Sequence, residues 1–192
     1  IRQELMKGNK EAGRQFCGFT SDKPVLMVIG GSLGAASVND HIRKILPELL
    51  KAFQVIHLCG KGKMDETLKG TEGYVQYEYI KEELPDLFAL SDVVISRAGA
   101  NAICEISALH KPNLLIPLSA NASRGDQILN AASFEKQGFS YVIKEEELTS
   151  EKLLAAITSV DENKETYKQA MSQSNQQDAV VKVADIIEKA CK

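Results

Sequence analysis

The feature that most constrains the fold is a repeated order of segments: a short apolar run, a polar or glycine-containing turn, and a stretch with helical spacing. Continuous apolar runs of this length are typical of strands covered on both faces, and parallel strands need crossover helices. The pattern therefore predicts an α/β fold with a doubly wound, parallel, six-stranded, Rossmann-like sheet. The expected strands are Val25–Ile29, Gln54–Leu58, Tyr74–Ile80, Asp92–Ser96, Asn113–Pro117 and Tyr141–Ile143.

Apolar residues at helical spacing occur between the predicted strands and continue after the last strand. Residues 1–20 are charged and helix-compatible, with expected breaks at Gly8 and Gly13. The alternation occupies residues 24–145, and only helical patterns follow over 149–192. We interpret residues 1–192 as a single domain. The expected helices cover Ile42–Leu50, Met64–Leu68, Leu84–Leu90, Ala100–Leu109, Asp126–Gly138, Leu153–Val160, Lys164–Met171 and Ala179–Ala190.

The amino-acid composition limits which partners and which cellular compartment we expect for this protein. A formal net charge of -3 gives no overall basic field, so we expect no nucleic-acid partner. No apolar run approaches the roughly 20 residues that cross a bilayer, and no signal-peptide pattern is present. The cysteines Cys17, Cys59, Cys104 and Cys191 are widely spaced, which favours reduced structural thiols in a cytosolic protein. The chain begins at Ile1 rather than Met, which indicates a processed or excised fragment.

The stretch Ser96–Glu105 reads as a strand end, a tight turn and a helix start. The first amides of a helix lack intrahelical partners and lie at its positive end, and Gly99 lets a ligand approach the backbone. Glu105 adds a fixed carboxylate that can take two hydroxyls. A nucleotide's phosphate and ribose fit this arrangement, although Glu105 also fits a solvated helix face. Arg97 fits either a phosphate site or the cap of a strand end.

Two further turns follow predicted strands. The turn Gly30–Gly34 is off-register for a dinucleotide fingerprint, and no Walker lysine follows it. It is either a tight packing turn or a site where Ser32 and neighbouring amides hold a phosphate or the reacting sugar. The polar segment Ser119–Gln127 follows the fifth run, and Asp126 with Gln127 can bond sugar hydroxyls at the next helix start. Asp126 also fits the role of an acid that complements the helix dipole.

The remaining chemistry-bearing residues give no pattern of their own. His41, His57 and His110 are expected on a helix, on a strand and at a helix end, without a serine or cysteine partner for nucleophilic catalysis. The chain shows no metal-ligand spacing. We therefore expect neither a metal nor another cofactor.

Three ordered motifs together resemble the C-terminal half of the MurG family of UDP-N-acetylglucosamine (UDP-GlcNAc) transferases, which convert lipid I to lipid II in bacterial peptidoglycan synthesis. The resemblance runs from Arg2 to about the last predicted helix. It implies a GT-B glycosyltransferase, in which the C-terminal domain binds the nucleotide sugar. The motifs are Gly30–Ala35, Ser96–Gly99 with Glu105, and Ser123–Gln127 with Asn130 and Ala131.

The resemblance implies roles at the nucleotide end of the donor. Glu105 corresponds to the glutamate that holds the ribose hydroxyls, and Ile80 to the residue whose backbone reads the uracil. Ser32 corresponds to a diphosphate contact. Arg2 matches an arginine of the interdomain linker near the phosphates.

Further roles follow for the two helix starts. The amides at Gly99, Ala100 and Asn101 correspond to diphosphate contacts. Gln127 matches a glutamine that touches the GlcNAc hydroxyls. Asp126 stands where many relatives have the first of two adjacent glutamines. Because its carboxylate accepts hydrogen bonds but cannot donate them, the sugar selectivity is left open.

The resemblance also places the acceptor site, the membrane-facing patch and the catalytic base in an N-terminal domain, and we find no counterpart of that domain in this sequence. We therefore expect the chain to bind UDP-GlcNAc without transferring it and to contain no catalytic residue. The full-length enzyme would be cytoplasmic, peripheral on the inner face of the plasma membrane, and would meet lipid I there. Helix N-termini and Arg2 would stabilise the leaving UDP without a metal.

Three other interpretations share parts of this pattern. A stand-alone donor-binding subunit of the Alg13 type has the same motifs, and a start codon just before Ile1 in the native reading frame would favour it. A UDP-GlcNAc epimerase shares the two-domain architecture but requires acid and base groups that have no place here. An NAD-binding module fits least, because its fingerprint is off-register and no acidic residue ends the second strand.

Overall fold

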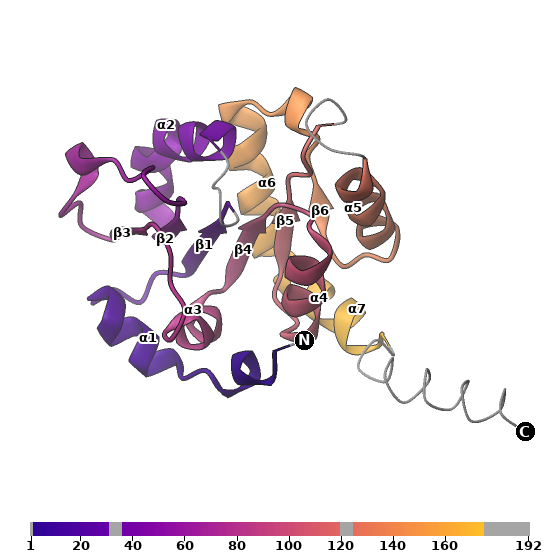
Figure 1. Ribbon diagram of the computed structural model, residues 1–192, viewed down its shortest axis with the longest axis horizontal. Coiled ribbons are helices and arrows are strands. Elements are labelled where there is room, and N and C mark those ends of the chain that lie inside the picture. The colour runs from indigo at the N-terminus through magenta and orange to yellow at the C-terminus, as the bar shows by residue number, and fades with distance from the viewer. Residues whose placement is uncertain (1, 31–35, 120–124, 175–192) are drawn as a thin grey trace, which may run out of the picture.

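The computed structural model describes residues 2–30, 36–119 and 125–174. Six strands form one parallel sheet in the order β3-β2-β1-β4-β5-β6 (Figure 1). This arrangement confirms the predicted fold class. The strands are β1 (Val25–Ile29), β2 (Gln54–Leu58), β3 (Tyr74–Tyr77), β4 (Val93–Ser96), β5 (Asn113–Leu115) and β6 (Tyr141–Val142).

Four strands are shorter than predicted, because a strand ends where its neighbour offers no further backbone to pair with. β3 ends at Tyr77 instead of Ile80, since Tyr77 pairs with Leu58, the last residue of β2. β5 ends at Leu115 instead of Pro117, opposite the last residue of β4. β4 and β6 are each one residue shorter than expected. The loops that follow β3 and β5 are correspondingly longer.

The helices follow the predicted order, apart from the predicted Ala179–Ala190 helix, which lies outside the described residues. A short 3-10 helix takes the place of the helix predicted around Met64, another lies within the helix-compatible residues 1–20, and a third, after β6, was not predicted. The α-helices are α1 (Lys10–Cys17), α2 (Ala36–Ala52), α3 (Leu84–Leu90), α4 (Ala100–Ala108), α5 (Asp126–Lys136), α6 (Ser150–Glu162) and α7 (Lys164–Ser172). The 3-10 helices are η1 (Gln3–Lys7), η2 (Glu66–Leu68) and η3 (Glu145–Glu147).

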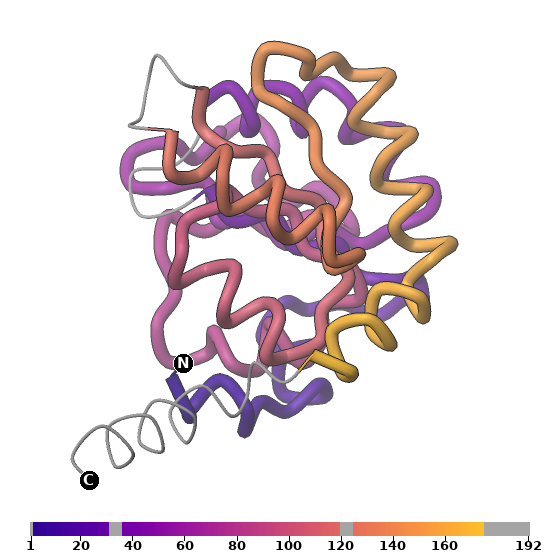
Figure 2. The backbone as a smooth tube through the Cα atoms, turned by 90° about the vertical axis from the view of Figure 1, so that its right-hand side faces the viewer, coloured from indigo at the N-terminus to yellow at the C-terminus, as the bar shows by residue number. Residues whose placement is uncertain are grey.

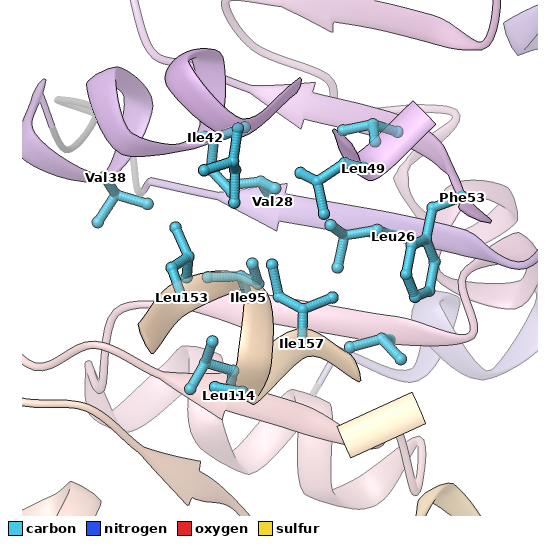
Figure 3. Close-up of a cluster of buried hydrophobic side chains, with 14 of the residues drawn as sticks. Leu26, Val28, Val38, Ile42, Leu49, Phe53, Ile95, Leu114, Leu153 and Ile157 are labelled. Atoms are coloured by element: carbon cyan, nitrogen blue, oxygen red, sulfur yellow. The ribbon is translucent and has the colours of Figure 1, made fainter. Parts of the chain in front are cut away.

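The sheet is buried on both faces, which explains its continuous apolar strands. Leu26 and Val28 of β1 pack against α2 and α6, whereas Val25 and Met27 point to the opposite core. Figure 3 shows the first core, where side chains from α2 and α6 meet those of the sheet. Figure 2 shows α6 running alongside α2 on one side of the molecule. The helices α1, α3, α4 and α5 contribute to the clusters of the other face.

Gly13 was predicted to break a helix, and this prediction is wrong. It lies inside α1, where a Cβ atom would come within 2.5 Å of the Asp86 carbonyl oxygen on α3. At Gly8, before α1, a Cβ would come within 2.0 Å of the Pro85 carbonyl oxygen. The two glycines therefore allow the first segment of the chain to pack closely on α3, and this contact outweighs the low helix propensity of Gly13.

Candidate functional site

The order of the strands identifies the edge of the sheet where folds of this kind usually bind their ligands. The chain runs from β1 outward to β2 and β3, returns to β4 beside β1, and then continues in the opposite direction. In sheets of this kind the crevice beyond the carboxyl ends of the two central strands is the usual binding position. The turn after β4 leads into α4 at this switch point. The turn after β1 includes Ser32, which lies outside the described residues, so its role stays a prediction.

The start of α4 leaves room for a ligand. Gly99 is its N-cap, and no side chain in the described part of the chain caps the first amides. The φ angle of Gly99 is -68°, and a Cβ added there would meet no atom of the described residues within 4 Å. Neither backbone conformation nor packing therefore requires glycine at this position. The open approach to the amides of Ala100 and Asn101 fits the predicted anion contact.

Glu105 lies in the second turn of α4 and forms a bidentate ion pair with Arg2. Arg2 Nε donates to Glu105 Oε1 at 2.8 Å, and Nη2 donates to Oε2 at 2.9 Å. The Glu105 side chain is 12% exposed, and that of Arg2 is 49% exposed. The hydrogen bond to Glu105 raises the pKa of Arg2. The structure thus brings together two predicted site residues that are 103 positions apart.

Ile80 follows the end of β3 and is half-buried against the α1–α3 side of the core. Its neighbour Tyr79 is 68% exposed. The charge of the Tyr79 hydroxyl makes only a minor contribution to raising the pKa of Arg2. Ile80 thus lies in the loop after β3 and Glu105 in the helix after β4, and their predicted roles at the uracil and the ribose stay predictions.

The start of α5 is held against the turns after β4 and β5. Gln127 Oε1 accepts a hydrogen bond of 3.1 Å from the Leu118 amide, so its side-chain NH₂ is the group left for a ligand. Asn130 Nδ2 donates to the Ala98 carbonyl oxygen at 3.0 Å, which ties α5 to the turn before α4. Asp126 is exposed in the first turn of α5. The predicted contacts of Asp126 and Gln127 with the sugar stay predictions.

The Arg97 guanidinium contacts the end of β5 and the segment after β6. Its guanidinium donates to the carbonyl oxygens of Ile116 and Pro117, at 3.0 and 3.3 Å. It also pairs with Glu145 on η3 at 2.5 Å. Burial opposes ionisation of Glu145, but hydrogen bonds from Arg97 and Ser119 outweigh it and lower the carboxyl pKa. Sequence reasoning missed Glu145, because no local pattern links it to a residue 48 positions earlier.

A buried polar chain connects α2 to β2 and β3. Asn39 Nδ2 donates to the Cys59 carbonyl oxygen, so Asn39 Oδ1 faces His57 Nε2 at 2.9 Å. Nε2 of His57 must therefore carry a proton, and Nδ1 accepts from the Tyr74 hydroxyl at 2.9 Å. Burial, with a smaller effect of the Arg43 charge, lowers the His57 pKa to about 3. The network is structural and was not predicted.

Among the described residues, two cavities lie near ends of the strands, and neither is lined by Glu105 or Gln127. One, of about 420 Å³, lies between the first turns of α2 and the segment before η2. The other, of about 540 Å³, lies at the amino ends of β4 and β5, opposite the predicted site. It contains Lys111, whose pKa burial lowers to about 8, and whose ammonium donates to the Ser91 carbonyl oxygen at 2.8 Å.

A membrane-spanning helix and a metal site of clustered side chains each have requirements that the described residues do not meet. No helix among them is both long and apolar enough to cross a membrane. They also contain no group of three or more histidine, cysteine or acidic side chains placed to hold a metal ion.

The sheet order and the position of the open edge define the class: the fold is that of the C-terminal half of the GT-B glycosyltransferases. The crystal structure of Acinetobacter baumannii MurG matches 97% of this chain and 55% of that chain, with a TM-score of 0.73 and 23% identity. An NMR structure of ALG13 matches 75% of this chain and 88% of that chain, with a TM-score of 0.52 and 16% identity. At these identities the likeness establishes the fold alone.

The chain belongs to the glycosyltransferase family 28 C-terminal domain family, whose model matches residues 25–189. It is 62% identical over 97% of its length to a protein of Lachnospira eligens. It is 63% identical over 98% of its length to one of Lachnoclostridium phytofermentans. Both are named UDP-N-acetylglucosamine--N-acetylmuramyl-(pentapeptide) pyrophosphoryl-undecaprenol N-acetylglucosamine transferase. The chain spans 53% of the length of each of these relatives.

Proposed function

We propose that this chain is the donor-binding domain of a MurG-type transferase that moves GlcNAc from UDP-GlcNAc to lipid I. The observation that carries the proposal is 62% identity, over 97% of the chain, to a relative named for this reaction. The geometry supports it, because the open start of α4 and the carboxylate of Glu105 lie on one helix at the switch point of the sheet. Such an arrangement suits a diphosphate followed by a ribose.

Different residues bind different parts of the donor. The Ile80 backbone binds the uracil, Glu105 the ribose diol, and the amides at the start of α4 the diphosphate. Gln127 offers its NH₂ group to the sugar, because its carbonyl oxygen already accepts from Leu118. Negative charge grows on the leaving UDP as the sugar–phosphate bond breaks, and helix N-termini with Arg2 stabilise that charge.

The transfer step needs groups from outside this chain. An acceptor hydroxyl, deprotonated by a base in a preceding domain, attacks the anomeric carbon with inversion. Closure of two domains around the donor excludes water and limits hydrolysis. We therefore propose that the isolated chain binds UDP-GlcNAc and does not transfer GlcNAc. Turnover of lipid I by the purified chain, assayed beside a full-length relative, would contradict this part of the proposal.

Calorimetric titration with UDP-GlcNAc tests the binding site directly. Glu105→Gln keeps the shape of the side chain but removes its charge, which weakens binding by about 2 kcal/mol, or roughly 30-fold in Kd. Glu162→Gln, on an exposed position of α6, is the matched control and leaves the affinity unchanged. The assignment fails if UDP-GlcNAc gives no heat, or if the Glu105 variant binds as tightly as the control.

A stand-alone subunit of the Alg13 type is the second candidate, because the matched ALG13 chain is covered over 88% of its length. The relatives with 62% and 63% identity are about twice as long as the matched region, which favours the two-domain enzyme. The native reading frame separates the two: a start codon directly before Ile1 would support the subunit.

A further inference from the structure

The bidentate pair between Arg2 and Glu105 occupies the carboxylate that the proposed function assigns to the ribose. Two nearly equal hydrogen bonds, of 2.8 and 2.9 Å, engage Nε and Nη2 of Arg2 with the two oxygens of Glu105. This planar fork is the geometry in which arginine and a carboxylate match best. Each oxygen of Glu105 thus already accepts one hydrogen bond from Arg2 in this structure.

The two partners differ in how firmly the fold holds them. Glu105 lies within α4, between Ile103 and Ile106, which are 4% and 1% exposed. Arg2 lies ahead of the short helix η1, and its side chain is 49% exposed against 12% for Glu105. Arg2 is therefore the partner that can leave, while Glu105 stays in place.

A ribose diol and the Arg2 guanidinium compete for the same atoms. A diol binds a carboxylate by donating one O–H to each oxygen, and this is also the arrangement of the two N–H donors of Arg2. We propose that Arg2 competes with the ribose for Glu105. Arg2 pairs with Glu105 when the site is empty, and the ribose displaces Arg2 when the nucleotide binds. This inference rests on the proposed function of Glu105.

The exchange also favours nucleoside diphosphates over nucleosides. Displacing Arg2 by two neutral hydroxyls removes the carboxylate that its guanidinium pairs with in this structure. A nucleoside provides nothing to replace that charge, whereas a diphosphate brings anionic oxygens to the site next to the ribose. Breaking the Arg2–Glu105 pair therefore weakens the binding of a nucleoside. A nucleoside diphosphate offsets this loss, because its phosphates pair with the released Arg2.

The test compares uridine with UDP on the wild-type chain and on Arg2→Gln, with Kd values measured by NMR titration. Without its competitor, the variant is expected to bind uridine about threefold more tightly. It is expected to bind UDP about tenfold more weakly, because the guanidinium no longer meets the diphosphate. The preference for UDP over uridine therefore falls about 30-fold. Lys7→Gln, an exposed position on η1 that removes the same charge, is the control and changes neither affinity.

The outcomes separate this inference from the proposed function. If wild type binds UDP but Arg2→Gln weakens uridine and UDP by the same factor, Arg2 is only a structural contact and the inference is wrong. If wild type binds neither ligand, the proposed function falls and the inference with it. A second readout is the Nε–H resonance of Arg2, which should shift on saturation with UDP in the way that Glu105→Gln shifts it. A resonance unmoved by bound UDP would show that the pair stays closed and would overturn the exchange.

Discussion

At the scale of single residues, the structure assigns roles that depend on partners far away in the sequence. Glu105 was predicted from its place in a helix after a strand, and the structure keeps it there. Its partner Arg2 and the pair of Arg97 with Glu145 join residues 103 and 48 positions apart. A local pattern gives the position of a side chain but not which distant side chain the fold brings to it. The sequence left the role of Arg97 open between a phosphate site and the cap of a strand end. Only the structure shows its contacts at the end of β5.

His57 gives a prediction at this scale. It is neutral when folded, with a pKa of about 3, so the unfolded chain takes up its proton first as the pH falls below about 6.5. Its contribution to the free energy of unfolding is therefore lost on acidification. We expect this loss to be about 2 kcal/mol between pH 7 and pH 5.

Urea unfolding of wild type and His57→Gln at these two pH values measures the effect. The variant should be less stable at pH 7, because Asn39 and Tyr74 lose their shared partner. Its stability should also fall less between pH 7 and pH 5 than that of wild type. Equal losses in the two proteins would show that His57 does not carry this pH dependence.

At the scale of elements, the two helices α1 and α4 use glycine for different reasons. Gly13 allows the backbone of α1 to touch α3, where a Cβ would approach an oxygen to 2.5 Å. A Cβ added at Gly99 would meet none of the described residues within 4 Å, and Gly99 has an ordinary φ of -68°. Their sequence contexts predicted a break at the first and a ligand approach at the second. Only the packing of α1 on α3 showed that the first prediction was wrong.

A matched pair of substitutions separates the two roles. Gly13→Ala should lower the free energy of unfolding by about 2 kcal/mol, because the clash is with backbone and exceeds the gain in helix propensity. Gly99→Ala should lower it by no more than about 1 kcal/mol, the usual cost of alanine at an N-cap, yet weaken UDP binding, because the methyl group enters the ligand's path. Denaturant unfolding and UDP titration of both variants provide the measurements. A Gly99 variant that binds UDP normally would contradict the close approach of the ligand.

At the scale of the whole molecule, the strand order sets the edge where the proposed donor site lies, since the order in which strands are added reverses between β1 and β4. A ligand at that edge stabilises the folded chain by mass action. UDP-GlcNAc at 100 times its Kd should add about 2.7 kcal/mol, which raises Tm by roughly 5–10 °C for a chain of this length. NAD at the same concentration should leave Tm unchanged. An equal rise with NAD would favour the dinucleotide module that the off-register glycines argue against.

The sequence by itself determined the fold class, the order of the elements and the family, because apolar runs, helical spacing and ordered motifs are local signals. The positions of Gly99, Ile80, Glu105 and Gln127 relative to the strand ends follow from the same signals. The tertiary structure alone decided where β3 and β5 end, why Gly13 lies inside a helix, and which partners Arg2 and Arg97 take. These features depend on close approach between segments far apart in the chain, which no local spacing encodes.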